Sequence, residues 1–209
     1  MEIKEFGKEI STIILGIFIL SLAISFKNPS IFYIALLSFT IIITLNIITK
    51  KIVGYFLEAD VTIKFWSWYQ YGFRKDSHFK NPLPMAWLPL VLSLLTKGFF
   101  WWLAIIEFDV KPRTERVSRK HGLYRFTEMT DWHIAWIASW GVIVNLLVAI
   151  IGYILGFEFF ARLSIYFATW SLVPIGSLDG NKIFFGSKGL WGTITTITLI
   201  LLGWGLLVI

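Results

Sequence analysis

Long apolar stretches, separated by short polar segments, dominate the pattern of this chain. Five of them cover about residues 10–26, 31–55, 132–155, 159–174 and 190–209. Each approaches the roughly 20 residues that an α-helix needs to cross a bilayer. Because the first stretch is followed by others, we interpret it as a membrane span and not as a cleaved signal peptide. The pattern predicts an all-α polytopic membrane protein with about five transmembrane helices.

The apolar segment 83–106 does not fit this pattern. Three prolines crowd its start, and Lys97-Gly98 lies in its middle. Proline removes a helical hydrogen bond, and glycine favours turns. We therefore expect this segment to form a re-entrant hairpin of two short arms, so that both of its ends lie on the same face of the membrane.

The distribution of basic residues supports the hairpin. If it forms, the basic segments 54–82 and 107–130 share one face with the N-terminus, and the opposite face keeps only Lys27 and Arg162. Cytoplasmic loops of membrane proteins carry an excess of lysine and arginine. The sequence therefore predicts that the N-terminus and both basic segments are cytoplasmic.

Composition adds two exclusions. Hydrophobic residues make up 56% of the 209 residues, and the formal net charge is +6. Because the basic residues flank the predicted spans, we attribute the charge to membrane topology and expect no nucleic-acid partner. The chain has no cysteine, which excludes disulfides and thiolate metal sites. We expect one integral membrane domain over residues 1–209, with the lipid bilayer as its first partner.

The loop 107–130 mixes charges with isolated apolar residues. These are Val110, Val117, Leu123, Tyr124 and Phe126. Their spacing is compatible with a small β-hairpin lying on the membrane face. A disordered basic loop explains the same composition, and both interpretations stay open.

An aspartate interrupts the last third of the chain. The segment Ser171-Leu-Val-Pro-Ile-Gly-Ser-Leu-Asp-Gly-Asn-Lys-Ile183 places Asp179 on a turn broken by proline and glycine. An ionisable side chain at membrane depth is costly and points to a functional site. An ordinary interfacial turn between two spans would explain the same residues.

Two motifs together resemble the site-2 protease family of intramembrane zinc metalloproteases. Gly141-Val-Ile-Val-Asn145 is similar to the family's Gly-Pro-x-x-Asn motif without its proline. Segment 171–182 is similar to Asn-x-x-Pro-x-x-x-Leu-Asp-Gly followed by Gly-Arg, with serine for the asparagine and lysine for the arginine. Pro174, Leu178, Asp179 and Gly180 match it. The resemblance covers roughly residues 31–190 and implies a three-helix core over 31–55, 132–155 and 159–179.

The family's third signature, His-Glu-x-x-His, is missing from the helix that should carry it. Asn46 and Lys50 stand where the two zinc-binding histidines should be, and Ile47 stands where the glutamate should be. Asparagine is a poor zinc ligand, a protonated lysine is none, and isoleucine cannot accept a proton from water. Simpler roles remain open, because Lys50-Lys51 also suits the inner end of a helix and Asn46 suits helix packing.

The resemblance thus implies a catalytically inactive site-2-protease-like membrane protein, acting as an adaptor or as a subunit of a membrane complex. Its partner would be another membrane protein or a transmembrane segment. We expect no metal and no cofactor. The cleft residues that the resemblance implies are Asn46, Lys50, Asn145, Pro174, Asp179 and Gly180.

Within this cleft we expect Lys50 to pair with Asp179 and to replace the zinc as the positive charge, with Asn46 donating to the same carboxylate. The competing expectation is that Lys50 reaches the headgroups. Two alternative functions stay open. One is an active zinc metalloprotease with non-standard ligands, drawn from Asp179 and from His78, His121 and His133. The other is a small transporter or channel component.

Overall fold

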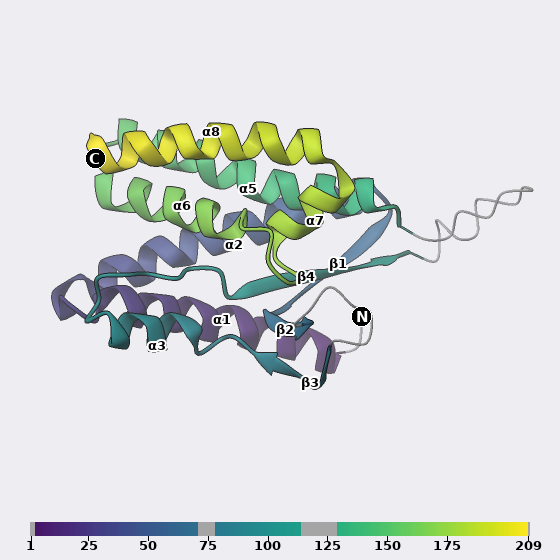
Figure 1. The fold of residues 1–209 in the computed structure, drawn as a ribbon, viewed down its shortest axis with the longest axis horizontal. Coiled ribbons are helices and arrows are strands. Elements are labelled where there is room, and N and C mark those ends of the chain that lie inside the picture. The colour runs from purple at the N-terminus through teal and green to yellow at the C-terminus, as the bar shows by residue number, and fades with distance from the viewer. Residues whose placement is uncertain (1–2, 71–77, 114–128, 209) are drawn as a thin grey trace, which may run out of the picture.

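The computed structural model describes residues 3–70, 78–113 and 129–208 (Figure 1). Four helices in these residues are long and apolar enough to cross a membrane. They coincide with four of the predicted apolar stretches. The prediction that these stretches form helices is therefore confirmed. These helices are α1 (Ile3–Ser25), α2 (Phe32–Phe56, after the 3₁₀ turn η1 at Pro29–Ile31), α5 (Asp131–Ile154) and α8 (Lys188–Leu207).

The fifth predicted span is a broken element. Helix α6 (Glu158–Ser171) has 14 residues and is therefore about 21 Å long, shorter than the roughly 30 Å of a bilayer core. Residues 172–178 interrupt it, and α7 (Asp179–Gly186) follows. Together α6, the interruption and α7 run beside α5 (Figure 1). The expected break near Pro174 is present, because proline and Gly176 (φ +57°) cannot continue the helix.

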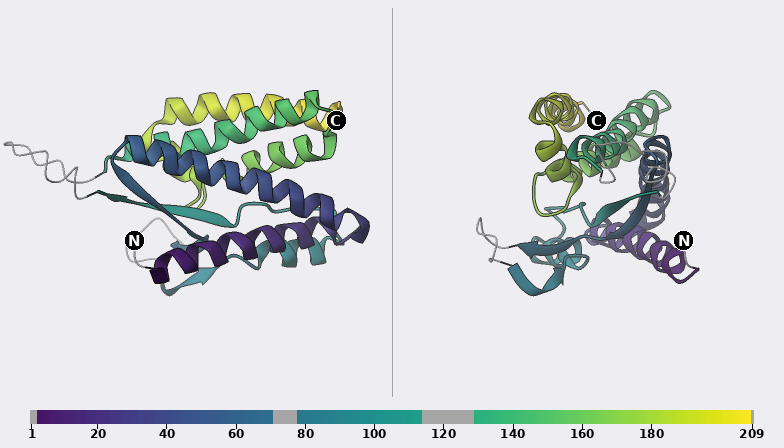
Figure 2. Two further views of the ribbon diagram at one scale, coloured as in Figure 1. Left: turned by 180° about the vertical axis from the view of Figure 1, so that it is seen from behind. Right: turned by 90° about the vertical axis from the view of Figure 1, so that its right-hand side faces the viewer.

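The segment 83–106 forms a hairpin, but its arms differ from the expected short pair. Strand β3 (His78–Pro84) leads into α3 (Leu88–Leu95), and an extended stretch returns to β4 (Ile106–Pro112). The arms lie alongside α1, with both ends at one end of the bundle (Figures 1 and 2). At the tip, a Cβ on Gly98 would lie 3.0 Å from Lys27. The tip of the hairpin therefore lies against the loop between α1 and α2. The returning arm spans this distance in few residues because an extended chain rises about 3.3 Å per residue.

Two small antiparallel sheets add to the mostly helical fold. Strand β1 (Ala59–Phe65) pairs with β4, from Ala59 opposite Pro112 to Phe65 opposite Ile106, and β2 (Ser67–Gln70) pairs with β3. The first part of the segment 107–130, for which a β-hairpin was expected, thus pairs with a strand outside that segment. Val110 is in a strand, but its partner is Val61. The other apolar residues named for that hairpin lie outside the described residues.

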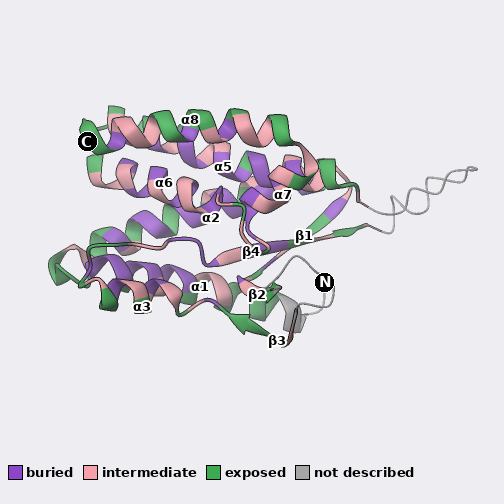
Figure 3. Cartoon of the chain, in the orientation of Figure 1, coloured by how far each residue is buried: buried purple, intermediate pink, exposed green. Residues whose placement is uncertain are grey.

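The core lies between the helices and beneath β4. Figure 3 shows buried residues on the facing sides of α2, α5 and α6. Large apolar side chains also cover the outer faces of the long helices, for example Ile14, Leu37, Ile154 and Ile200. Such extended apolar surface is unusual for a protein surrounded by water, and it suits a bilayer. The packing of α2, α5 and the broken α6–α7 element gives the site below its walls.

Candidate functional site: a buried ion pair between α2 and α7

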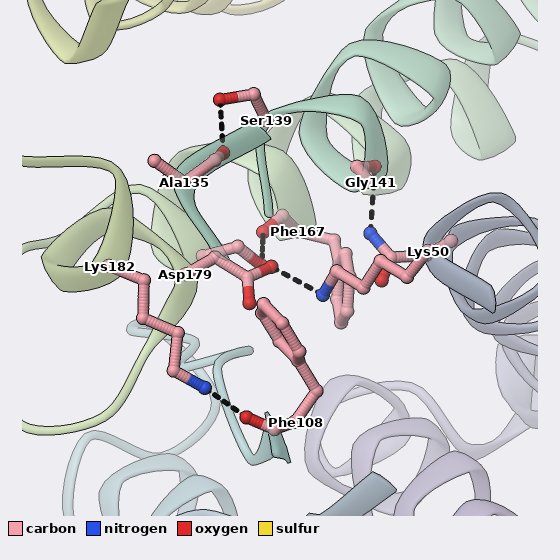
Figure 4. Close-up of polar contacts among 10 residues, drawn as sticks. Lys50, Phe108, Ala135, Ser139, Gly141, Phe167, Asp179 and Lys182 are labelled. Atoms are coloured by element: carbon pink, nitrogen blue, oxygen red, sulfur yellow. Dashed lines mark hydrogen bonds and ion pairs between the residues drawn. The ribbon is translucent and has the colours of Figure 1, made fainter. Parts of the chain in front are cut away.

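Lys50 and Asp179 form a buried ion pair. The Lys50 Nζ lies 2.6 Å from the Asp179 Oδ2, and the two side chains are 5% and 4% exposed (Figure 4). Lys50 comes from the C-terminal part of α2, and Asp179 is the first residue of α7. The pairing expected from the sequence is confirmed, and the alternative in which Lys50 reaches the headgroups is wrong.

Local structure favours the carboxylate at this position. Leu178 is extended (φ −65°, ψ 163°) and is the N-cap residue of α7, so Asp179 lies in the first turn of that helix. The N-terminus of a helix carries a partial positive charge that stabilises an anion. The second carboxylate oxygen, Oδ1, is buried and has no hydrogen-bond partner among the described residues. The ammonium group of Lys50 is therefore the main compensation for this charge.

A glycine on α5 makes room for the lysine. A Cβ at Gly141 would lie 2.4 Å from the Lys50 Cε, so the aliphatic chain of Lys50 crosses α5 at this glycine. The Asn46 Nδ2 donates to the Gly141 carbonyl oxygen at 2.7 Å. The expectation that Asn46 donates to Asp179 is thus wrong, because its amide donates to the backbone of α5.

A second glycine brings α7 against the end of α6. A Cβ at Gly180 would lie 1.9 Å from the Leu172 carbonyl oxygen, which is a backbone atom and cannot move independently. Only a residue without a side chain permits this approach. Gly180 therefore fixes the position of α7 and, with it, the carboxylate of Asp179.

A second lysine, Lys182, contacts the same aromatic ring as Lys50. The Lys182 Nζ donates to the Phe108 carbonyl oxygen and lies 3.8 Å from the centre of that ring. The Lys50 Nζ lies 4.9 Å from the same ring centre (Figure 4). Burial lowers the pKa of Lys182 from 10.5 to about 8, although the nearby Asp179 charge acts in the opposite direction.

Strand β4 supplies both Phe108 and a buried carboxylate, Glu107. The Glu107 Oε2 accepts from the Ser177 hydroxyl and from the Ser67 N–H. Burial raises the pKa of Glu107, and the hydrogen bond from Ser177 opposes that shift. Sequence reasoning missed both residues because they opened a segment that looked like a basic loop. The alternation of Ile106, Phe108 and Val110 was the available signal.

The remaining predicted residues are distributed differently. Ile47 is 6% exposed and belongs to the hydrophobic core. Asn145 is buried, and neither of its side-chain amide atoms has a hydrogen-bond partner among the described residues. The backbone carbonyl oxygen of Asn145 accepts a hydrogen bond from the Ser164 hydroxyl at 2.7 Å. Pro174 is exposed in the interruption before α7, so it shapes the chain path and does not line the ion pair.

The three histidines come from different parts of the chain. His133 lies in the first turn of α5 and its ring contacts the Thr130 hydroxyl, His78 is the first residue of β3, and His121 lies outside the described residues. Within residues 3–70, 78–113 and 129–208, no group of three or more histidine, aspartate and glutamate residues is placed to hold a metal ion. The absence of metal binding nevertheless stays a prediction.

Searches of protein-family models, curated proteins and solved structures found no match to this chain. The resemblance to site-2 proteases therefore depends on the two motifs and on the residues that surround them.

Proposed function

We propose that this chain is a multi-pass integral membrane protein with a site-2-protease-like core, that it has no protease activity, and that it binds a transmembrane segment of another membrane protein. The observation that carries this proposal is the Lys50–Asp179 ion pair. It joins one of the positions that the resemblance assigns to a zinc-binding histidine with the aspartate of the second motif.

Charge compensation explains why such a pair suits a metal-free core. In the proteases that the chain resembles, a dication holds the corresponding carboxylate. Without the dication a buried carboxylate would be uncompensated, at a cost of several kcal/mol. The ammonium group at 2.6 Å lowers that cost. It also occupies the carboxylate, and a protonated lysine is not a zinc ligand.

Helix α8 offers the best surface for a partner helix. Only 17% of its most apolar window is buried, the lowest share among the four long apolar helices of the described residues. Gly192, Thr196 and Gly203 share one face of it, and a Cβ added at either glycine would meet nothing within 4 Å. Small residues allow close packing between transmembrane helices.

An apolar hollow of about 200 Å³ lies on the neighbouring side of α8, between this helix and the interruption before α7. It brings a partner on α8 within reach of the segment that positions Asp179. The residues lining it are Thr169, Leu172, Val173, Pro174, Trp191, Thr195, Thr198 and Leu199.

Site-specific crosslinking tests the partner. A photoreactive residue at Thr196, introduced in the native membrane, should capture a membrane protein through a transmembrane peptide. The same residue at Leu37, which is 63% exposed on α2, is the matched control and should capture lipid only. Capture of lipid alone at both positions would contradict a partner on α8.

Elemental analysis tests the loss of the metal site. Protein purified without a polyhistidine tag should contain far less than one zinc per chain. About one zinc per chain that disappears in Asp179→Ala would overturn the proposal and would favour an active protease with unusual ligands.

A further inference from the structure

A cavity of about 380 Å³ lies between the start of α1 and the sheet formed by β1 and β4, away from the ion pair. Its lining combines basic, hydroxyl and apolar groups from three elements. The lining residues are Lys8, Glu9, Thr12, Thr62, Ile63, Lys64, Phe65 and Lys111. Nothing in the proposed adaptor function requires a cavity with this chemistry.

The charges around the cavity favour an anion. Lys8, Lys64 and Lys111 line it together with one carboxylate, Glu9. Lys51 and Asp109 adjoin it as the ion-pair partners of Glu9 and Lys64, which makes four lysines and two carboxylates. The Lys51 Nζ lies 2.7 Å from the Glu9 Oε1, and Lys64 pairs with Asp109. The formal excess of two positive charges lies at the end of the bundle where α1, α5 and α8 begin and α2 ends. In a membrane, a phosphate would reside at such an end of the spans.

Glu9 adds a requirement for a hydrogen-bond donor. Its side chain is 4% exposed, and the Oε1 accepts from the Ile63 N–H at 3.2 Å in addition to the Lys51 contact. The Oε2 is buried and has no partner among the described residues. Buried carboxylate oxygens are normally hydrogen-bonded. A ligand that brings a hydroxyl group to this oxygen would complete the site without adding positive charge.

An apolar track leads away from the cavity along α1. Leu15 and Leu22 follow Lys8 at intervals of seven residues, so the three residues share one face of the helix. Leu15 is 50% and Leu22 37% exposed. An acyl chain attached to a phosphate in the cavity can lie along these side chains.

We propose that this cavity binds the headgroup of an anionic phospholipid with a hydroxylated head, of the phosphatidylglycerol class. The phosphate lies among Lys8, Lys64 and Lys111, a headgroup hydroxyl donates to the Glu9 Oε2, and the acyl chains follow Leu15 and Leu22. The inference uses the membrane location of the proposed function but is independent of the metal and of the protein partner.

Binding of short-chain lipids to the delipidated full chain in neutral detergent tests the site. Dihexanoyl phosphatidylglycerol should bind one per chain, at least about tenfold more tightly than phosphatidylcholine, whose head is zwitterionic and has no donor. Phosphatidylmethanol carries the same charge without a hydroxyl and should also bind more weakly. Equal affinity for all three lipids, or for the two anionic ones, would overturn the proposal.

Paired variants localise the site. Lys8→Met/Lys111→Met should weaken phosphatidylglycerol binding about tenfold or more. Lys80→Met/Lys97→Met removes the same charge from exposed positions outside the cavity and should change the affinity less than about twofold. All four residues are exposed, so the variants should keep the thermal stability of the native protein. Equal losses in the two pairs would mean non-specific attraction and would reject the site.

Glycerophosphoglycerol, the deacylated headgroup, distinguishes the source of the ligand. It should bind much more weakly than the lipid because it lacks the contacts to the apolar track. If it binds as tightly as the lipid, and Lys8→Met/Lys111→Met weakens it equally, the cavity belongs to a soluble phosphodiester and the lipid assignment is wrong.

Discussion

At the scale of single residues, the ion pair between Lys50 and Asp179 makes a quantitative prediction. Lys50→Met or Asp179→Asn alone should lower the free energy of unfolding by about 3–5 kcal/mol, because each leaves one buried group without its partner. The double variant should recover much of this loss, since it removes both charges. Thermal or chemical denaturation in detergent measures the free energy of unfolding of the two single variants and of the double variant, each relative to the native protein.

The exposed pair formed by Lys64 and Asp109 is the matched control. Its side chains are 55% and 49% exposed, so the same double-variant cycle should give at most about 1 kcal/mol of coupling. Strictly additive losses for Lys50 and Asp179 would mean that the two residues do not interact in solution.

Lys182 predicts a pH dependence. Because its pKa is about 8 in the folded chain and 10.5 ordinarily, the unfolded chain binds more protons between these values. The contribution of Lys182 to stability therefore rises as the pH increases from about 8 to about 10.5. The melting temperature of the native protein minus that of Lys182→Met, measured from pH 7 to pH 10, should therefore increase with pH. Parallel curves would contradict the lowered pKa.

At the scale of elements, two glycines control how the helices meet. Gly180→Ala should destabilise the protein by about 1–3 kcal/mol or more, because the new Cβ clashes with backbone at Leu172. Gly141→Ala meets the Lys50 side chain instead, so it should cost less stability and should weaken the coupling between Lys50 and Asp179. The double-variant cycle, repeated in the Gly141→Ala background, measures that coupling.

Two open glycines on α8 provide the control at this scale. Gly192→Ala and Gly203→Ala meet nothing within 4 Å, and alanine favours a helix over glycine by about 1 kcal/mol. They should leave the stability of the isolated chain unchanged or raise it slightly. A larger loss of stability from Gly192→Ala than from Gly180→Ala would contradict the close packing of Gly180 and the open surroundings of Gly192.

At the scale of the whole molecule, the hairpin predicts which residues share a face of the membrane. Single cysteines at Lys80 and Lys111, introduced into this cysteine-free chain, should react with an impermeant thiol reagent from the same side. Cysteines at Lys27 and Lys97 should react from the other side, because Gly98 at the tip meets Lys27. Labelling of Lys80 and Lys111 from opposite sides would reject the hairpin topology.

Much of the helical framework could be predicted from the sequence alone. The long helices follow from uninterrupted apolar stretches, and the break before α7 follows from Pro174 and the neighbouring glycine. Both are local effects of hydrogen bonding and burial, which a single stretch of chain carries by itself. The pairing of Lys50 with Asp179 was also predictable, because a buried carboxylate requires compensation and the motifs pointed to the lysine.

Other features were settled only by the tertiary structure. The sequences of β1 and β4 mix charged and apolar residues, but their pairing joins Ala59 with Pro112 across the intervening hairpin. That pairing places Phe108 over both lysines and forms a wall of the cavity near Glu9. Strand partners and buried ion contacts depend on which distant faces meet, and no local pattern carries that information. Helices and breaks were thus determined along the chain, whereas the chemistry around them was determined by packing between its distant parts.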